Sequence, residues 1–186
     1  MFVRDWMSAP AVVVPLVVPV HAAVGFMEQR KIRRLPVVES GRLVGIVTRN
    51  DLQAALGRDP ARGAALRVAE VMTPDPVTVE RDDTLEAAAQ LMLRKKISGL
   101  PVISGGRVAG ILTESDLFRA LCRMMGFGER GARITLTVGQ GADLLEAIRR
   151  RLDGLSLQSL VTVRDRERGV WNVVLRVRGR VAAIGR

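Results

Sequence analysis

The sequence has no tyrosine, one cysteine (Cys122) and one histidine (His21) among its 186 residues. A single cysteine excludes an intramolecular disulfide framework and is typical of proteins in reducing compartments. One histidine and one cysteine also argue against a zinc site with several such ligands and against a histidine-based catalytic triad. Aromatic residues make up only 3% of the chain, so the core is expected to be aliphatic.

The sequence also lacks an apolar run long enough to cross a membrane. The longest candidate, residues 9–20, falls short of the roughly 20 residues that a spanning helix needs. Pro10, Pro15 and Pro19 interrupt it, and Asp5 lies where a secretory signal would carry positive charge. We therefore expect a cytoplasmic protein that does not bind membranes. With 48% hydrophobic residues, the chain can form one large domain or two small ones around a proper core.

The chain has few acidic residues, because 19 aspartates and glutamates stand against 29 lysines and arginines. The net charge is therefore +10. All but three of the basic residues are arginines. Such a balance favours anionic partners, namely phosphorylated metabolites, nucleic acid or an acidic protein, without choosing among them. A general arginine bias of the genome would produce the same composition.

An internal repeat organises two thirds of the chain, because residues 3–121 match themselves at a shift of 65 residues without a gap. Leu-Pro-Val-Val at 35–38 aligns with Leu-Pro-Val-Ile at 100–103, and Gly-Ile-Val-Thr at 45–48 aligns with Gly-Ile-Leu-Thr at 110–113. Gly-Arg at 41–42 and Asp-Leu at 51–52 recur as well, at 106–107 and 116–117. We interpret this match as a duplication.

Each repeat is predicted to fold as strand, helix, strand, strand, helix. In the second repeat, Asp82 and Asp83 supply cap chemistry for a helix that begins at Thr84, and Gly105-Gly106 indicates a hairpin turn. The five predicted elements are a strand at 76–79, a helix at 84–95, strands at 100–103 and 108–112, and a helix at 114–122. The first repeat follows the same plan with a longer first strand, Val12 to Val18.

The pattern changes after residue 125. A strand at 133–138, an amphipathic helix at 142–152 and a hairpin of strands at 155–163 and 170–177 predict a small β-α-β-β unit. The expected organisation is a first repeat at 1–57, a linker at 58–67, a second repeat at 68–125, a linker at 126–132 and the small unit at 133–186.

The two repeats resemble a tandem pair of CBS domains, the Bateman module. The shared features are the Leu-Pro-Val-Val/Ile strand and the following Gly-x-hydrophobic-hydrophobic-Gly-Ile-hydrophobic-Thr-x-x-Asp-Leu segment, present in both copies. The C-terminal unit resembles an incomplete ACT domain, and the whole chain is similar to the acetoin-utilisation family of CBS–ACT proteins. The resemblance implies an α/β (α+β) fold, in which a tandem CBS-domain pair of β-α-β-β-α repeats is followed by a small β-α-β-β ACT-like domain.

The resemblance further implies a non-catalytic regulatory protein, a homodimer through the CBS pair, that senses an adenosyl ligand in two clefts and acts on an enzyme or another protein. The ligand would be an adenine nucleotide (AMP, ADP or ATP) or S-adenosylmethionine, with no metal. Each cleft would draw on both repeats. One would combine Thr113 and Asp116 with Ile32, Arg33 and Arg34, and the other Thr48 and Asp51 with Thr73, Thr78, Ile97, Ser98 and Gly99.

Without the resemblance, the two Thr-x-x-Asp segments have a second interpretation as helix caps, since threonine is a good N-cap and an aspartate suits the first turn. An aspartate carboxylate can equally accept two hydrogen bonds from a ribose diol, and the two roles can coexist. Three rival functions remain open. They are an enzyme, a structural dimer module with empty clefts, and a nucleic-acid-binding accessory protein that uses Arg149, Arg150, Arg151, Arg164, Arg166 and Arg168.

Overall fold

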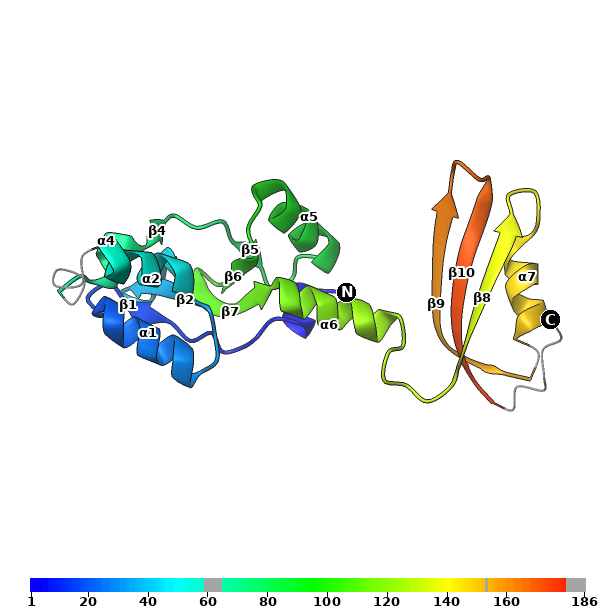
Figure 1. Cartoon of the computed structure of the whole chain (residues 1–186), viewed down its shortest axis with the longest axis horizontal. Coiled ribbons are helices and arrows are strands. Elements are labelled where there is room, and N and C mark those ends of the chain that lie inside the picture. Colours follow the sequence, from blue (N-terminus) through cyan, green and yellow to red (C-terminus); the bar gives the residue numbers. More distant parts are fainter. Residues whose placement is uncertain (59–64, 153, 180–186) are drawn as a thin grey trace. The chain divides into compact units, whose positions relative to one another are not determined.

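The computed structural model describes residues 1–58, 65–152 and 154–179. The chain divides into two compact units, Met1–Leu117 and Phe118–Arg186 (Figure 1). Residues 59–64 of the predicted linker 58–67 and residues 180–186 of the predicted C-terminal unit lie outside the described residues. Within the described ranges, none of the helices has the length and apolar character that a membrane crossing requires.

The first repeat has the predicted order of elements. These are β1 (Val14–Pro15), α1 (Val20–Gln29), β2 (Arg34–Glu39), β3 (Arg42–Thr48) and α2 (Arg49–Arg58). Strand β1 runs parallel to β2, and β2 forms an antiparallel hairpin with β3. The hairpin turn places Ser40 and Gly41 at φ values of 49° and 80°, which is the backbone of a type I′ turn.

The second repeat repeats this plan with β5 (Val79–Glu80), α5 (Leu85–Lys95), β6 (Gly99–Ser104), β7 (Arg107–Thr113) and α6 (Glu114–Met124). The predicted hairpin turn at Gly105-Gly106 is confirmed, with φ values of 58° and 74°. Both hairpins carry a register shift at equivalent positions, between Val37 and Val38 and between Val102 and Ile103. The internal symmetry of the sequence is therefore preserved in the backbone.

Three local predictions were wrong. The expected strand Val12 to Val18 is reduced to β1, because only Val14 and Pro15 pair with β2 and a proline offers no N–H to a ladder. The expected strand 76–79 is likewise reduced to β5, which pairs with β6 only at Val79 and Glu80. The cap of α5 is not an aspartate, since the Thr84 side chain accepts the hydrogen bond from the Ala87 N–H at 3.1 Å.

Two segments pack against the sheet of the other repeat. The short helix α4 (Val68–Val71) and strand β4 (Thr73–Pro74) follow the linker, yet they complete the first repeat. The Val68 N–H donates to the Val18 carbonyl at 2.8 Å, and β4 extends the sheet to the order β1-β2-β3-β4. In the same way the N-terminal 3-10 helix η1 (Val3–Asp5) joins the second repeat, where the Val3 N–H donates to the Asp83 carbonyl at 2.9 Å.

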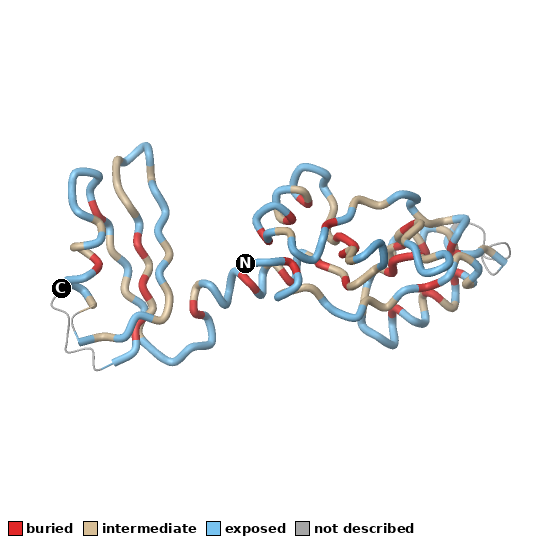
Figure 2. The backbone as a smooth tube through the Cα atoms, turned by 180° about the vertical axis from the view of Figure 1, so that it is seen from behind, coloured by how far each residue is buried: buried red, intermediate tan, exposed pale blue. Residues whose placement is uncertain are grey.

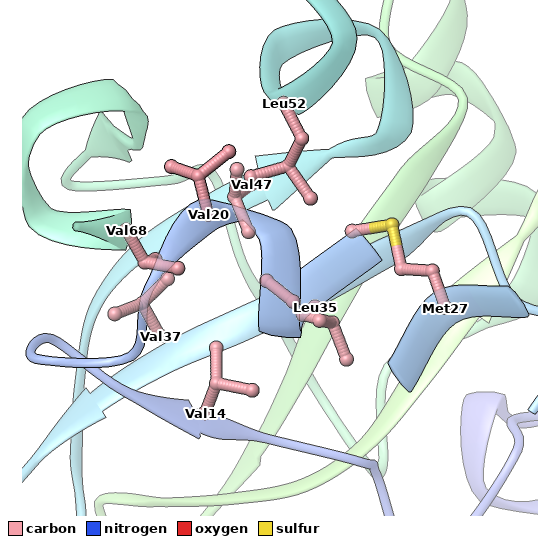
Figure 3. Packing of buried hydrophobic residues seen from close by; sticks show 9 residues of the cluster. Val14, Val20, Met27, Leu35, Val37, Val47, Leu52 and Val68 are labelled. Carbon is pink, nitrogen blue, oxygen red and sulfur yellow. The ribbon is translucent and has the colours of Figure 1, made fainter. Parts of the chain in front are cut away.

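The core of the first repeat is aliphatic, as the composition predicted. Its buried residues include Leu35, Val37 and Val47 from the hairpin and Met27 from α1 (Figure 3). Val68 belongs to this cluster although it is the first residue of the second repeat in sequence, so the exchanged segment supplies part of the core. Figure 2 shows the buried residues gathered on strands and on one side of the helices in each unit.

The close approach of the N-terminal segment to β7 gives a prediction for Gly110. A Cβ atom there would lie 2.8 Å from the backbone oxygen of Ser8 and 2.7 Å from the Sδ atom of Met7. Gly110→Ala is therefore expected to lower the free energy of unfolding by about 1–3 kcal/mol. Gly25→Ala is the matched control, because a Cβ in the middle of α1 meets nothing within 4 Å. It should stabilise by about 0.5–1 kcal/mol. Urea denaturation measures the free energy of unfolding of both variants. Equal changes in the two variants would contradict the predicted close approach at Gly110.

The second unit contains β8 (Ala132–Gly139), α7 (Leu144–Arg151), β9 (Ser156–Asp165) and β10 (Val170–Arg178). The predicted β-α-β-β order is observed, and the strands form an antiparallel sheet in the order β8-β10-β9. Asp143 caps α7 by accepting hydrogen bonds from the N–H groups of Leu145 and Glu146. Helix α7 packs on the side of the sheet that buries Val173, Leu175 and Val177.

Candidate functional site

The Thr-x-x-Asp segment of the first repeat joins the end of β3 to the start of α2. The Asp51 Oδ2 atom accepts hydrogen bonds from the Thr48 N–H at 2.8 Å and from the Thr48 hydroxyl at 2.7 Å. The Thr48 Oγ1 atom accepts in return from the Asp51 N–H at 3.3 Å. This reciprocal pattern is a capping box, so the helix-cap interpretation of the motif holds in the first repeat.

The second repeat places the equivalent threonine and aspartate at the junction of β7 and α6. The Asp116 Oδ2 atom accepts from the Thr113 N–H at 2.7 Å and from the Thr113 hydroxyl at 2.6 Å. Asp116 is 1% exposed and is the one charged residue among the described residues that is buried. A buried carboxylate needs hydrogen-bond donors around it, and the turn that leads into α6 provides two of them.

The residue pair before the Leu-Pro strand differs between the repeats, and this difference brings the repeats into contact. Arg34, at the start of β2, donates from Nη2 to the Ser98 hydroxyl at 2.6 Å. Its guanidinium also fills the space beside Gly99, where a Cβ would lie 2.8 Å from the Arg34 Cδ atom. Arg34 was predicted to belong to one cleft and Ser98 and Gly99 to the other, and the two groups meet here.

Two acidic residues at the start of α6 influence the pKa of Arg34. Burial lowers the pKa of Arg34 below its usual value, and the neighbouring Arg33 lowers it further, whereas Glu114 and Asp116 act in the opposite direction. Arg34 and Asp116 interact electrostatically, and their grouping in one cleft stays a prediction. Glu114 was not among the predicted site residues, although it directly follows Thr113 where the first repeat has Arg49.

The remaining predicted site residues lie at both ends of the strands. The carbonyl groups of Arg33 and Ser98 accept hydrogen bonds from the first helical residue of α2 and α6, at 2.9 Å and 3.3 Å. Thr73 pairs with Ile46 in β3, two residues from Thr48. Ile32 and Ile97 are half-buried beside them. Thr78 instead lines a groove at the hairpin turns, the end of β2 and β3 opposite to Thr48.

The family model for the CBS domain matches residues 3–58 and 68–123. The chain belongs to the CBS-domain family. The two matched ranges coincide with the two repeats, so the predicted CBS pair is confirmed, and the C-terminal sheet lies beyond the matched residues. Both capped Thr-x-x-Asp segments described above fall inside the CBS repeats.

Among known proteins, the chain is 33% identical to a CBS domain-containing protein of Dictyostelium discoideum, covering 66% of this chain and 92% of that protein. It is 39% identical over 100 residues to the inosine-5'-monophosphate dehydrogenase of Korarchaeum cryptofilum, covering 53% of this chain. It is also 36% identical over 104 residues to an uncharacterized protein of Methanocaldococcus jannaschii. The chain spans only 20% and 37% of the lengths of these last two proteins.

Three solved structures of CBS proteins resemble this one. The CBS domain pair of protein MJ0100, in complex with 5'-methylthioadenosine and S-adenosyl-L-methionine, has a TM-score of 0.60 and 30% identity, covering 65% of this chain and 95% of that one. CBSX2 in complex with AMP has a TM-score of 0.59 and 32% identity, covering 66% and 96%. A proposed acetoin utilization protein (AcuB) from Vibrio cholerae has a TM-score of 0.62 and 28% identity, covering 69% and 96%.

The arginines that favoured nucleic acid fall into two groups within the C-terminal unit. Three of them end α7, whereas the others surround the β9–β10 turn (Figure 1). The Gln140 N–H donates to the Gly169 carbonyl at 3.1 Å, so the loop before α7 lies at that turn. The arginine end of α7 is then about 12 Å away, at 1.5 Å per residue. Arg150 and Arg168 are also paired with acidic residues of their own segments.

Proposed function

We propose that this chain is a non-catalytic regulatory protein whose CBS pair binds an adenosyl ligand, either an adenine nucleotide or S-adenosylmethionine. The observation that carries the proposal is the presence of a fixed aspartate at the start of the second helix in both repeats. Two similar CBS structures contain AMP or S-adenosylmethionine with 5'-methylthioadenosine. These likenesses support an adenosyl ligand for this chain as well.

The geometry of the cap suits a ribose diol. The Oδ2 atom of Asp51 accepts two hydrogen bonds from Thr48, while Oδ1 receives no hydrogen bond from a described residue. That oxygen can accept from the ribose hydroxyls, and the adjacent helix N-terminus carries free N–H groups that suit a phosphate. In the other proposed cleft, that of Asp116, Arg33 and Arg34 add positive charge before the first Leu-Pro strand, where guanidinium groups can pair with phosphate oxygens.

We also propose that the ligand state passes to the C-terminal unit or to a partner protein, and that the chain forms a homodimer. The β-α-β-β order of the C-terminal unit supports an ACT-like domain as the receiver. Apolar side chains exposed on α6, Phe118 at 66% and Leu121 at 48%, support an assembly through this helix. For ligand binding to act as a signal, it must favour one arrangement of the repeats over another.

Calorimetric titration of the full chain with AMP, ATP, S-adenosylmethionine and NAD tests the proposal. We expect one of them to bind, and Asp51→Asn with Asp116→Asn to weaken it about 100-fold, because a charged acceptor contributes on the order of 1.5–3 kcal/mol at each site. Asparagine keeps one acceptor oxygen for the threonine N–H, so the cap should survive. Sedimentation equilibrium of the same samples should give about twice the chain mass of 20.3 kDa.

Asp143→Asn is the matched control, since Asp143 caps α7 through the same kind of hydrogen bond in the other unit. It should leave the affinity unchanged. Thermal unfolding establishes that each variant is folded. Absence of binding for all four ligands in folded protein, or equal binding by the double variant, would contradict the proposal and leave the Thr-x-x-Asp segments as helix caps.

A further inference from the structure

A groove of about 760 Å³ lies between the two hairpin turns of the CBS pair. One wall comes from Ser40–Leu43 at the β2–β3 turn and the other from Gly105–Arg107 at the β6–β7 turn. The connection between β4 and β5, which Figure 1 shows passing from one sheet to the other, contributes Asp75, Pro76 and Thr78. This volume falls within the range of about 300–1,000 Å³ that small-molecule sites occupy.

Two equivalent arginines line the groove. Arg42 and Arg107 stand at the same position of the two repeats, directly after the turn, and both are exposed. Neither forms an ion pair with any residue in the described ranges. Asp75 is the single acidic residue of the lining, so the groove carries more positive than negative charge.

The rest of the lining combines an apolar surface with hydroxyl groups. Leu43, Pro76 and Ile103 provide the apolar part, and Ser40 and Thr78 provide the hydroxyls. Two guanidinium groups in one groove are suited to phosphate oxygens, which guanidinium groups can bind bidentately. The apolar and hydroxyl-bearing surface beside them suits the body of a small organic molecule, and Asp75 can accept from its hydroxyl groups.

We propose that this groove is a second ligand site of the CBS pair, which binds a phosphorylated small molecule through Arg42 and Arg107. It lies at the end of the hairpins opposite to Thr48 and Thr113, a strand length away, at about 3.3 Å per residue. A ligand held between the two turns contacts both repeats at once. Its binding is independent of the aspartates on which the adenosyl site is proposed to rest.

Inorganic pyrophosphate is the probe, titrated into the ¹⁵N-labelled full chain at about 50 mM salt and followed by amide chemical shifts. We expect saturable shifts at Gly41, Gly105 and Gly106, and none at Thr48 or Thr113. Arg42→Ala with Arg107→Ala should weaken binding at least tenfold, since each lost charge-assisted contact alone is worth on the order of tenfold. Arg30→Ala with Arg94→Ala removes the same charge from exposed positions outside the groove and should change the affinity less than twofold.

Asp51→Asn with Asp116→Asn separates this site from the adenosyl site, because it should leave pyrophosphate binding intact whether or not it abolishes an adenosyl ligand. Three outcomes would overturn the inference. They are the absence of saturable shifts at the turn glycines, equal weakening by the two arginine pairs, and loss of pyrophosphate binding in the aspartate variant. The first would mean an empty groove, the second unspecific attraction by net charge, and the third a single site at the Thr-x-x-Asp segments.

Discussion

Val3→Asp is expected to destabilise the second repeat by about 3–5 kcal/mol, although Val3 belongs to the first repeat in sequence. Its side chain is 0% exposed, and its backbone is hydrogen-bonded to Asp83. An aspartate there would be a charge without a partner in an apolar environment, which is among the largest single-residue penalties. Urea denaturation measures the loss, and native-state hydrogen exchange locates it. Protection should fall first in α5 and β7 and later in β2 and β3.

Val17→Asp provides the matched control, because it introduces the same charge at a residue that is 60% exposed. It should change the free energy of unfolding by no more than about 0.5 kcal/mol. Val68→Asp is the reciprocal variant, since Val68 lies in the core of the first repeat. In the Val68→Asp variant, protection from hydrogen exchange should be lost first in α1 and β2. If the Val3 variant lost protection first in the first repeat, the exchange of segments would be contradicted.

Leu100→Ala should cost about 2–5 kcal/mol, the range found when a fully buried leucine is truncated and leaves a cavity. Leu100 is 0% exposed, one residue after the start of β6 and opposite Leu112 in β7. The side chain therefore lies in the interior of the second repeat at the position that Leu35 occupies in the first. The midpoint of urea unfolding should fall while the slope of the transition stays the same.

Leu93→Ala is the control for this variant, because Leu93 is 78% exposed on α5 of the same repeat. Removing its side chain leaves no cavity, and the alanine suits a helix, so the stability should change by less than about 0.5 kcal/mol. A loss at Leu93 as large as the one at Leu100 would mean that the exposed face of α5 is covered, for example by a second copy of the chain.

The elements of the CBS pair were largely predictable because local chemistry determines them. Two residues that readily adopt the left-handed backbone conformation indicate a hairpin turn when they follow an apolar run. Gly105-Gly106 forms such a turn. The helix predicted to begin at Thr84 is present as α5, although the Thr84 hydroxyl caps it in place of the predicted Asp82 and Asp83. Strand length was not predictable in the same way, since Val12 to Val18 is apolar throughout while a partner strand is available to Val14 and Pro15 alone.

The arrangement of the repeats could not be predicted from the alignment at a shift of 65 residues. The alignment shows that residues 3–8 and 68–73 are equivalent, but a segment can satisfy the same hydrogen bonds on either copy of the sheet. The contact of Arg34 with Ser98 was missed for a related reason. It depends on the distance between two segments 64 residues apart, and nothing in either segment encodes that distance.

Helix η1 packs on the second repeat and α4 packs on the first, and this exchange also bears on how such a chain can arise. A protein with only one repeat would have no partner for its own first segment and could complete its sheet only by swapping that segment with a second copy, in a closed twofold exchange. Tandem duplication places both partners in one molecule, so the exchange no longer depends on protein concentration. The two halves are then free to diverge, as position 34 and its equivalent at 99 have done with an arginine and a glycine.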